Sequence, residues 1–330
     1  MELPNLKQLK ADAAHALRRG REPKAVILWY VGISTLLALA VSVLNLWLTH
    51  RISNTGGLGN MGTRSILSTV QAILPLAQSL VAGCLELGYL HAMLRICRGQ
   101  YADQTDLKVG FSKILPLIRL TALQCLLCFA AAYFTYQASF SIFLLTPWAD
   151  PMLELASSLP QGSILDASVM ITEEFANQAA SSMIPMLVIW VILLCLVMIP
   201  LSYRIRFAFY ALLEEPRGRA FAALMTSFKM TRHNCWKLFR LDLSYWWYYA
   251  LTILSALLCY ADTLLKTFGI FLPMNETLAY FLFYGLYLAA NFAIIYFFLN
   301  RVQATYTVAY ESLREKPAND GVVLGNIFDM

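Results

Sequence analysis

Long apolar segments recur along this chain and constrain its fold more than any motif does. Each run of about 20 residues can cross about 30 Å of hydrocarbon as a helix. Hydrophobic residues make up 59% of the 330 residues and charged residues 14%, against about one-quarter charged in globular proteins. Because backbone polar groups in lipid must be satisfied within the segment, these runs predict helices. We therefore expect an all-α protein, a polytopic helical membrane bundle.

Six membrane-spanning helices are predicted, with approximate bounds 25–48, 66–94, 114–145, 183–201, 241–260 and 278–299. They form one membrane domain over residues 25–312, preceded by an amphipathic lead-in at 1–24 and followed by a loose tail at 313–330. Residues 3–19 place leucines on one helical face and basic residues on the other. That pattern is typical of a helix that lies on a membrane surface, and equally of a helix docked on its own spans.

The basic residues are concentrated on one side of the predicted spans. Of the 25 Lys and Arg, 21 fall on one side and three on the other. The basic side comprises residues 1–24, 95–113, 201–240 and 301–330. Because basic loops stay inside, both termini are predicted to be cytoplasmic, in a cell membrane. The net charge of +5 therefore concerns topology, and no nucleic-acid partner is expected.

Residues 200–249 are the richest basic segment and end in five consecutive Trp and Tyr residues. Within this segment an apolar face opposes Arg219 and predicts a second interfacial helix, whose cations can meet anionic headgroups; the face comprises Phe221, Leu224, Met225 and Phe228. Asn234 is expected to cap the helix that becomes the fifth span. For the aromatic block, ordinary interfacial anchoring is the simplest interpretation.

Ionisable side chains inside the apolar runs are the first place to look for function. Glu86 in the second span and Arg119 in the third lie at similar depths from the basic side, so the two can pair. A buried ion pair that fixes helix registry is the simplest interpretation. A substrate or proton site is the alternative.

A second candidate cluster lies where the fourth span ends and the fifth begins. Asp242 enters the membrane near the level of Arg204 and Arg206, which predicts a cytoplasmic-side cluster of the three. Packing and anchoring explain such a cluster more simply than chemistry does.

No motif in the chain indicates catalysis. The four histidines are scattered, and Cys125 and Cys128 lie in an apolar run where core packing explains them best. Phosphate-binding loops, dinucleotide fingerprints, zinc-protease motifs and nucleophile elbows are absent from the sequence. We therefore predict no catalytic, metal-binding or cofactor-binding residues, and no enzyme.

Two stretches carry a resemblance to a known family. The first keeps the spaced order Gly88, Arg98-Gly99, Asp106-Leu107 and Gly110-Phe111. The second contains Pro200, Tyr203, Phe209-Tyr210, Ala220, Ser227, Met230, Phe239, residues 241–244 and Trp246-Trp247. Together they resemble the bacterial membrane family catalogued as domain of unknown function 975. Thr231-Arg232 stands where that family often has a glycine.

This resemblance implies a multi-pass protein of a bacterial cell membrane without an established activity. A distant likeness to the membrane domains of some glycerophosphodiester phosphodiesterases suggests work close to lipid. The function expected from residues and resemblance together is binding of membrane lipid or of a partner membrane protein. The main alternative is a transporter or permease-like subunit, which would need a water-accessible cavity at Glu86, Arg119 or Asp242. An intramembrane enzyme would need several polar groups converging in one pocket.

Overall fold

The computed structural model describes residues 3–19, 23–54, 61–150, 173–215, 217–269 and 276–315. These residues form helices joined by turns, and no strand occurs among them. The predicted all-α architecture is therefore confirmed. By its contacts the chain divides into two compact units, of which one comprises Met1–Leu120 with Phe207–Met330 and the other Thr121–Arg206.

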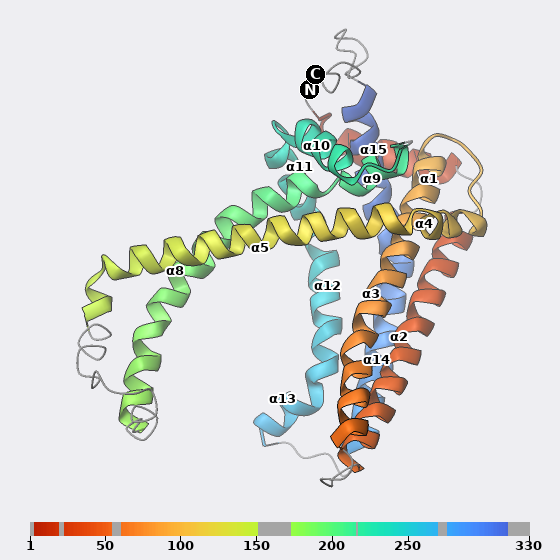
Figure 1. Ribbon diagram of the computed structural model, residues 1–330. Coiled ribbons are helices and arrows are strands. Elements are labelled where there is room, and N and C mark those ends of the chain that lie inside the picture. The colour runs from red at the N-terminus through yellow and green to blue at the C-terminus, as the bar shows by residue number, and fades with distance from the viewer. Residues whose placement is uncertain are drawn as a thin grey trace. The chain divides into compact units, whose positions relative to one another are not determined.

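Long apolar helices run side by side in the first unit (Figure 1): α2 (Pro23–Asn54), α3 (Met61–Cys97) and α14 (Glu276–Ile294). The shorter α12 (Trp246–Leu257) packs beside α14. Tyr30 of α2 stacks on Tyr89 of α3, with 4.6 Å between the ring centroids. Ile27, Val31 and Met93 are buried in the same cluster. The core of this unit therefore lies towards the C-terminal end of α3.

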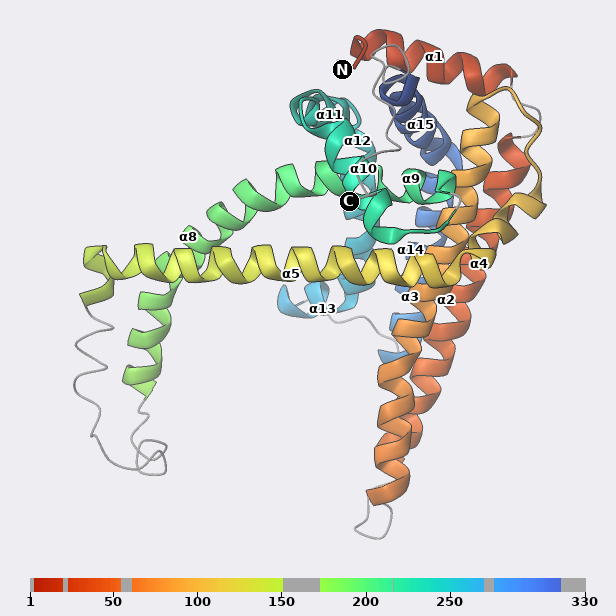
Figure 2. The same cartoon turned by 45° about the horizontal axis from the view of Figure 1, so that its top comes forward.

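Short helices gather at one end of this unit (Figure 2). They are η2 (Gln104–Lys108), α4 (Val109–Ser112), α9 (Ala208–Glu214), α10 (Ala220–Thr231) and α11 (Cys235–Leu243). Among them, η2, α4 and α9 contact α3, and α10 packs on α9. The amphipathic α1 (Leu6–Arg19) lies on α15 (Asn300–Glu315), with Leu9 and Ala13 buried. Of the two sequence interpretations of this lead-in, the structure supports docking on the protein.

The second unit contains the part of α5 (Ile114–Leu144) that follows Leu120, together with η3 (Pro147–Ala149) and α8 (Glu173–Ile205). Phe143, Ala149 and Met186 form its buried cluster. Tyr136 meets Trp190 edge to face, with 6.3 Å between the ring centroids. Aromatic and aliphatic packing therefore joins the two helices of this unit.

Five helices in the described part of the chain are long and apolar enough to cross a membrane: Lys24–Ser53, Gly62–Cys97, Ile114–Leu144, Met183–Glu214 and Phe281–Arg314. The helix expected over residues 241–260 is instead interrupted. The chain turns at Ser244 and Tyr245, and the apolar helix that follows covers only Trp246–Tyr260. At 1.5 Å per residue it measures about 22 Å, short of a bilayer core. A sixth span therefore stays a prediction.

The remaining elements follow this short helix. They are η4 (Leu258–Tyr260), α13 (Ala261–Thr267) and the π-helical turn η5 (Ile295–Leu299), which joins α14 to α15. The tail predicted from residue 313 begins inside α15, where Leu313 is fully buried. Residues 316–330 lie outside the described part of the chain.

Candidate functional site

Two glycines allow the turn η2–α4 to lie directly against α3. A Cβ added to Gly88 would lie 2.3 Å from the carbonyl oxygen of Leu107, and one added to Gly110 would lie 1.8 Å from that of Cys84. Real Cβ atoms do not approach backbone so closely, so only glycine fits at either position. The spacing of these glycines thus brings residues 101–113 back along the last turns of α3.

The same turn is held by a buried carboxylate. Asp106 accepts a hydrogen bond from the backbone N–H of Asp103 at 2.9 Å, and Asp103 in turn caps η2. Its other oxygen accepts a hydrogen bond from Arg95 Nη1 at 2.6 Å, and His91 Nδ1 lies 3.5 Å from that oxygen. A buried charge is tolerated when it is paired and hydrogen-bonded. Asp106 therefore fixes the η2 turn and the Arg95 side chain together.

A second ion-pair network begins directly after α3. Gly99, with φ +73°, ends the helix through its N–H bond to Ile96 O, the left-handed cap that glycine adopts without strain. This turn places Arg98 Nη2 2.6 Å from Glu311 Oε1 on α15, and Arg98 also pairs with Glu214 of α9. Arg98 therefore joins three segments that are distant in the sequence.

Glu214 is the acidic centre of this network. It also pairs with Arg314 Nη1 at 2.8 Å and accepts a hydrogen bond from the Tyr310 hydroxyl at 2.6 Å. Burial lowers the pKa of the Arg98 guanidinium, but its hydrogen bonds to Glu214 and Glu311 outweigh this, so that its pKa lies above the usual value. The Arg98 side chain therefore stays charged.

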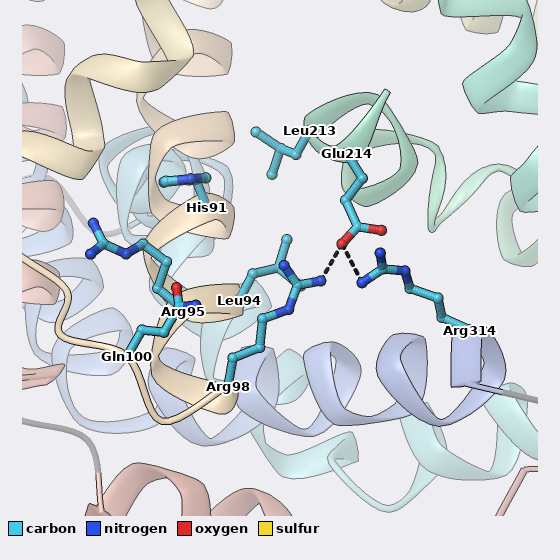
Figure 3. A pocket seen from close by; sticks show the side chains of 8 residues that line it. All are labelled: His91, Leu94, Arg95, Arg98, Gln100, Leu213, Glu214 and Arg314. Carbon is cyan, nitrogen blue, oxygen red and sulfur yellow. Dashed lines mark hydrogen bonds and ion pairs between the residues drawn. The ribbon is translucent and has the colours of Figure 1, made fainter. Parts of the chain in front are cut away.

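A cavity of about 510 Å³ opens beside this network. Its lining is His91, Leu94, Arg95, Arg98, Gln100, Leu213, Glu214 and Arg314. Figure 3 shows Arg98 and Arg314 reaching Glu214 from two different segments, with Arg95 and Gln100 on the α3 side. A smaller cavity of about 360 Å³ lies between α1, the end of α3 and α15, and Arg98 lines it too.

Lys113 binds the C-terminal end of α9. Its Nζ donates hydrogen bonds to the carbonyl oxygens of Leu212, at 3.1 Å, and Leu213, at 2.7 Å, which a helix end leaves without partners. Burial lowers the pKa of Lys113, and the neighbouring Glu215 opposes this shift. Lys113 therefore holds the α9 end of the cavity in place.

Glu86 and Arg119 do not form the predicted ion pair; both are described and both are exposed. Cys84, Leu87 and Leu117 pack together where the two helices meet. The contact between the two helices is therefore made by apolar side chains, and the expected ion pair does not form between these two described residues.

Asp242 is held by tyrosines. It accepts a hydrogen bond from Tyr249 at 2.7 Å and another from Tyr306 of α15. Arg204 and Arg206 belong to the other unit, so a cluster of Asp242 with them stays a prediction. Neither of the two cavities is lined by Asp242, Glu86 or Arg119.

Asn234 occupies the predicted N-cap position of α11, but its side chain does not cap that helix. Its Oδ1 instead accepts a hydrogen bond from the backbone N–H of Leu3 at 3.0 Å. Lys237 Nζ donates to the carbonyl oxygen of the same residue at 3.1 Å. Both side chains therefore tie the N-terminal segment to α11, a long-range contact that the local capping pattern does not reveal.

A helix, α10, is observed where the interfacial helix was predicted, but its faces differ from the expectation. Leu224 is buried together with Ser227 and Thr231, whereas Phe221 and Met225 are exposed. On α11, Trp236 is 63% exposed, with the Arg240 guanidinium 5.6 Å from its ring centroid. Ser227 and Thr231 face the protein on the same side of α10, and within the helix the Thr231 hydroxyl donates a hydrogen bond to the backbone carbonyl oxygen of Ser227 at 2.8 Å.

Local sequence patterns do not reveal the Arg98 network. The sequence marks Arg98 only through the family resemblance, and no pattern marks Glu214, Glu311 or Arg314. Its partners lie 116 and 213 residues away along the chain, and no local pattern connects residues so far apart. Among the residues that the structure describes, no three His, Cys, Asp or Glu gather as a metal site.

Comparison of the chain with protein-family models, with curated proteins and with solved structures finds no match. The resemblance to the bacterial membrane family therefore stays a prediction.

Proposed function

We propose that this protein is a non-catalytic, multi-pass cell-membrane protein that binds anionic phospholipid at the inner face of the bilayer. Binding occurs on the α10–α11 surface, defined as the exposed side chains Phe221, Met225, Lys229, Arg232, Trp236 and Arg240. The long apolar helices support insertion into a membrane. The excess of Lys and Arg in this part of the sequence supports the inner face.

One observation carries the proposal: these exposed cations make no ion pair with the described residues, and one of them lies over an exposed aromatic ring. Across the described residues, neither Lys229 nor Arg232 makes an ion pair, and Arg240 contacts only the Trp236 ring. Phe221, Met225 and Lys229 lie four residues apart, hence on one face of α10. Trp and Phe enter the headgroup region while Lys and Arg meet lipid phosphates. Each such cation adds about 1 kcal/mol near an anionic surface.

The test is lipid-dependent thermal stability of the full chain in detergent. A ligand that binds only the folded protein raises Tm. Phosphatidylglycerol is expected to raise Tm more than phosphatidylcholine does, and the variant Lys229→Gln/Arg232→Gln/Arg240→Gln is expected to lose most of this difference. The control is Arg51→Gln/Arg64→Gln, which removes exposed cations from the opposite predicted side. Equal losses in both variants would contradict the proposal.

A further inference from the structure

The 510 Å³ cavity presents hydrogen-bond donors that the protein itself does not use. Arg95 donates only through Nη1, to Asp106, and its Nε and Nη2 have no partner among the described residues. The side-chain amide of Gln100 likewise makes no hydrogen bond with any described residue. Arg98 uses Nε and Nη2 and leaves Nη1 without a partner within the same described part. The α3 side of the cavity therefore offers several N–H groups to a ligand.

The acidic groups nearby are already compensated. Glu214, the one carboxylate in the cavity lining, receives Arg98, Arg314 and the Tyr310 hydroxyl. Asp106 is buried behind Arg95, and Glu311 pairs with Arg98 and lines the smaller cavity. A charge that is paired and hydrogen-bonded repels an entering anion less than a free one does. The three guanidinium groups of the lining are balanced by these three carboxylates, so the unused N–H groups, and not an excess of positive charge, would hold an anion here.

These features point to a particular ligand chemistry. Planar guanidinium groups bind phosphate oxygens through paired N–H bonds, and amide N–H groups complete such sites. A phosphate monoester carries up to two charges and three oxygens for these donors, more than a diester offers. The volume lies in the range of small-molecule sites and exceeds what a phosphate group alone needs.

We propose that this cavity binds a phosphate monoester group, with Arg95, Arg98 and Gln100 as its donors. The group is supplied either by a lipid headgroup such as that of phosphatidic acid or by a soluble phosphate. The site is separate from the α10–α11 surface and does not depend on the function proposed for it.

Two measurements on the full chain in detergent separate these sources. Calorimetric titration with inorganic phosphate reports the soluble source. Native mass spectrometry with phosphatidic acid, compared with phosphatidylserine at equal concentration, reports the lipid source, because only the former carries a monoester. Binding is expected in at least one of the two measurements. A preference for phosphatidic acid over phosphatidylserine would identify a lipid headgroup as the source of the phosphate.

Variants connect that binding to the cavity. Arg95→Gln is expected to weaken it about tenfold, the effect of removing a charge-assisted donor, and Gln100→Ala about threefold. Gln100→Ala decides the matter if Arg95→Gln folds poorly, because the Gln100 side chain has no partner in the described part of the chain. Lys108→Gln, an exposed cation outside the cavity lining, is the matched control and should bind as the wild type does.

Three results would overturn the proposal: absence of binding in both arms, equal affinity of Gln100→Ala and wild type, or equal retention of the two lipids without phosphate binding. If the cavity does not bind phosphate, the lipid-dependent Tm test of the α10–α11 surface keeps its meaning. A lipid-dependent Tm rise that survives Gln100→Ala but not the α10–α11 variant assigns that rise to the surface alone.

Discussion

The two halves of α3 differ in what surrounds them. In its N-terminal half the large apolar side chains are open, with Ile66 at 66% and Leu76 at 68% exposure. In its C-terminal half Leu87, Leu90 and Met93 are each exposed by 3% or less. Both halves are apolar in sequence, so hydrophobicity alone does not separate them. Neighbouring protein covers one half, and in our proposal lipid covers the other.

This difference shows where specific contacts are needed. A lipid-facing helix needs only length and apolar side chains, because lipid adapts to its surface. The C-terminal half instead packs on η2–α4 through Gly88 and Gly110 and ends in the Arg98 network. Precise packing and paired charges tolerate substitution poorly.

The close approach of α4 to α3 gives the largest expected effect. In Gly110→Ala the new Cβ would lie 1.8 Å from the carbonyl oxygen of Cys84, so the two segments must separate. We expect a loss of more than about 3 kcal/mol in the free energy of unfolding, seen as a large fall in Tm in detergent.

Gly32→Ala is the control for this substitution, because nothing lies within 4 Å of the added Cβ on α2. It should stabilise the helix by up to about 1 kcal/mol. Similar Tm values for the two variants would show that the glycine contact does not hold η2–α4 in place.

Truncation of two leucines of α3 compares its halves directly. Leu90→Ala leaves a cavity in packed protein and should cost about 3 kcal/mol in the free energy of unfolding. Leu76→Ala removes a side chain that is 68% exposed and should cost about 0.5 kcal/mol. Denaturant titration of both variants in the same detergent measures the difference. Equal costs would mean that the N-terminal half packs on protein, for instance on a second copy or a partner.

Replacement of two glutamates by glutamine tests whether paired charge distinguishes the regions. Glu214→Gln leaves Arg98 and Arg314 without their shared carboxylate, and we expect a loss of about 1.5 kcal/mol, since these side chains are partly exposed. Glu86→Gln removes an exposed charge without an ion-pair partner among the described residues and should change stability by less than about 0.5 kcal/mol. If Glu86→Gln lowers Tm more than Glu214→Gln does, the charge of Glu86 and not that of Glu214 stabilises the fold.

Much of the architecture was predictable because it depends on local composition. Apolar runs of membrane-spanning length favour helices, and the one expected over residues 25–48 lies within α2 while the one over 114–145 matches α5 to within one residue. The break at Ser244 and Tyr245 was not predictable in this way. Apolar residues continue through it, and Asp242 beside it is held by Tyr306, which is 64 residues away.

The candidate site was beyond the reach of local patterns. Its charges lie in loops and helix ends that read as ordinary solvated segments, and the ion pair expected from depth alone, Glu86 with Arg119, does not form. Depth along a helix follows from residue number, but the face on which a side chain lies against a neighbour follows from packing. The sequence by itself determined which segments are helical and apolar. Only the tertiary structure decided that Arg98, Glu214 and Glu311 meet, because pairing over such separations depends on how the helices pack.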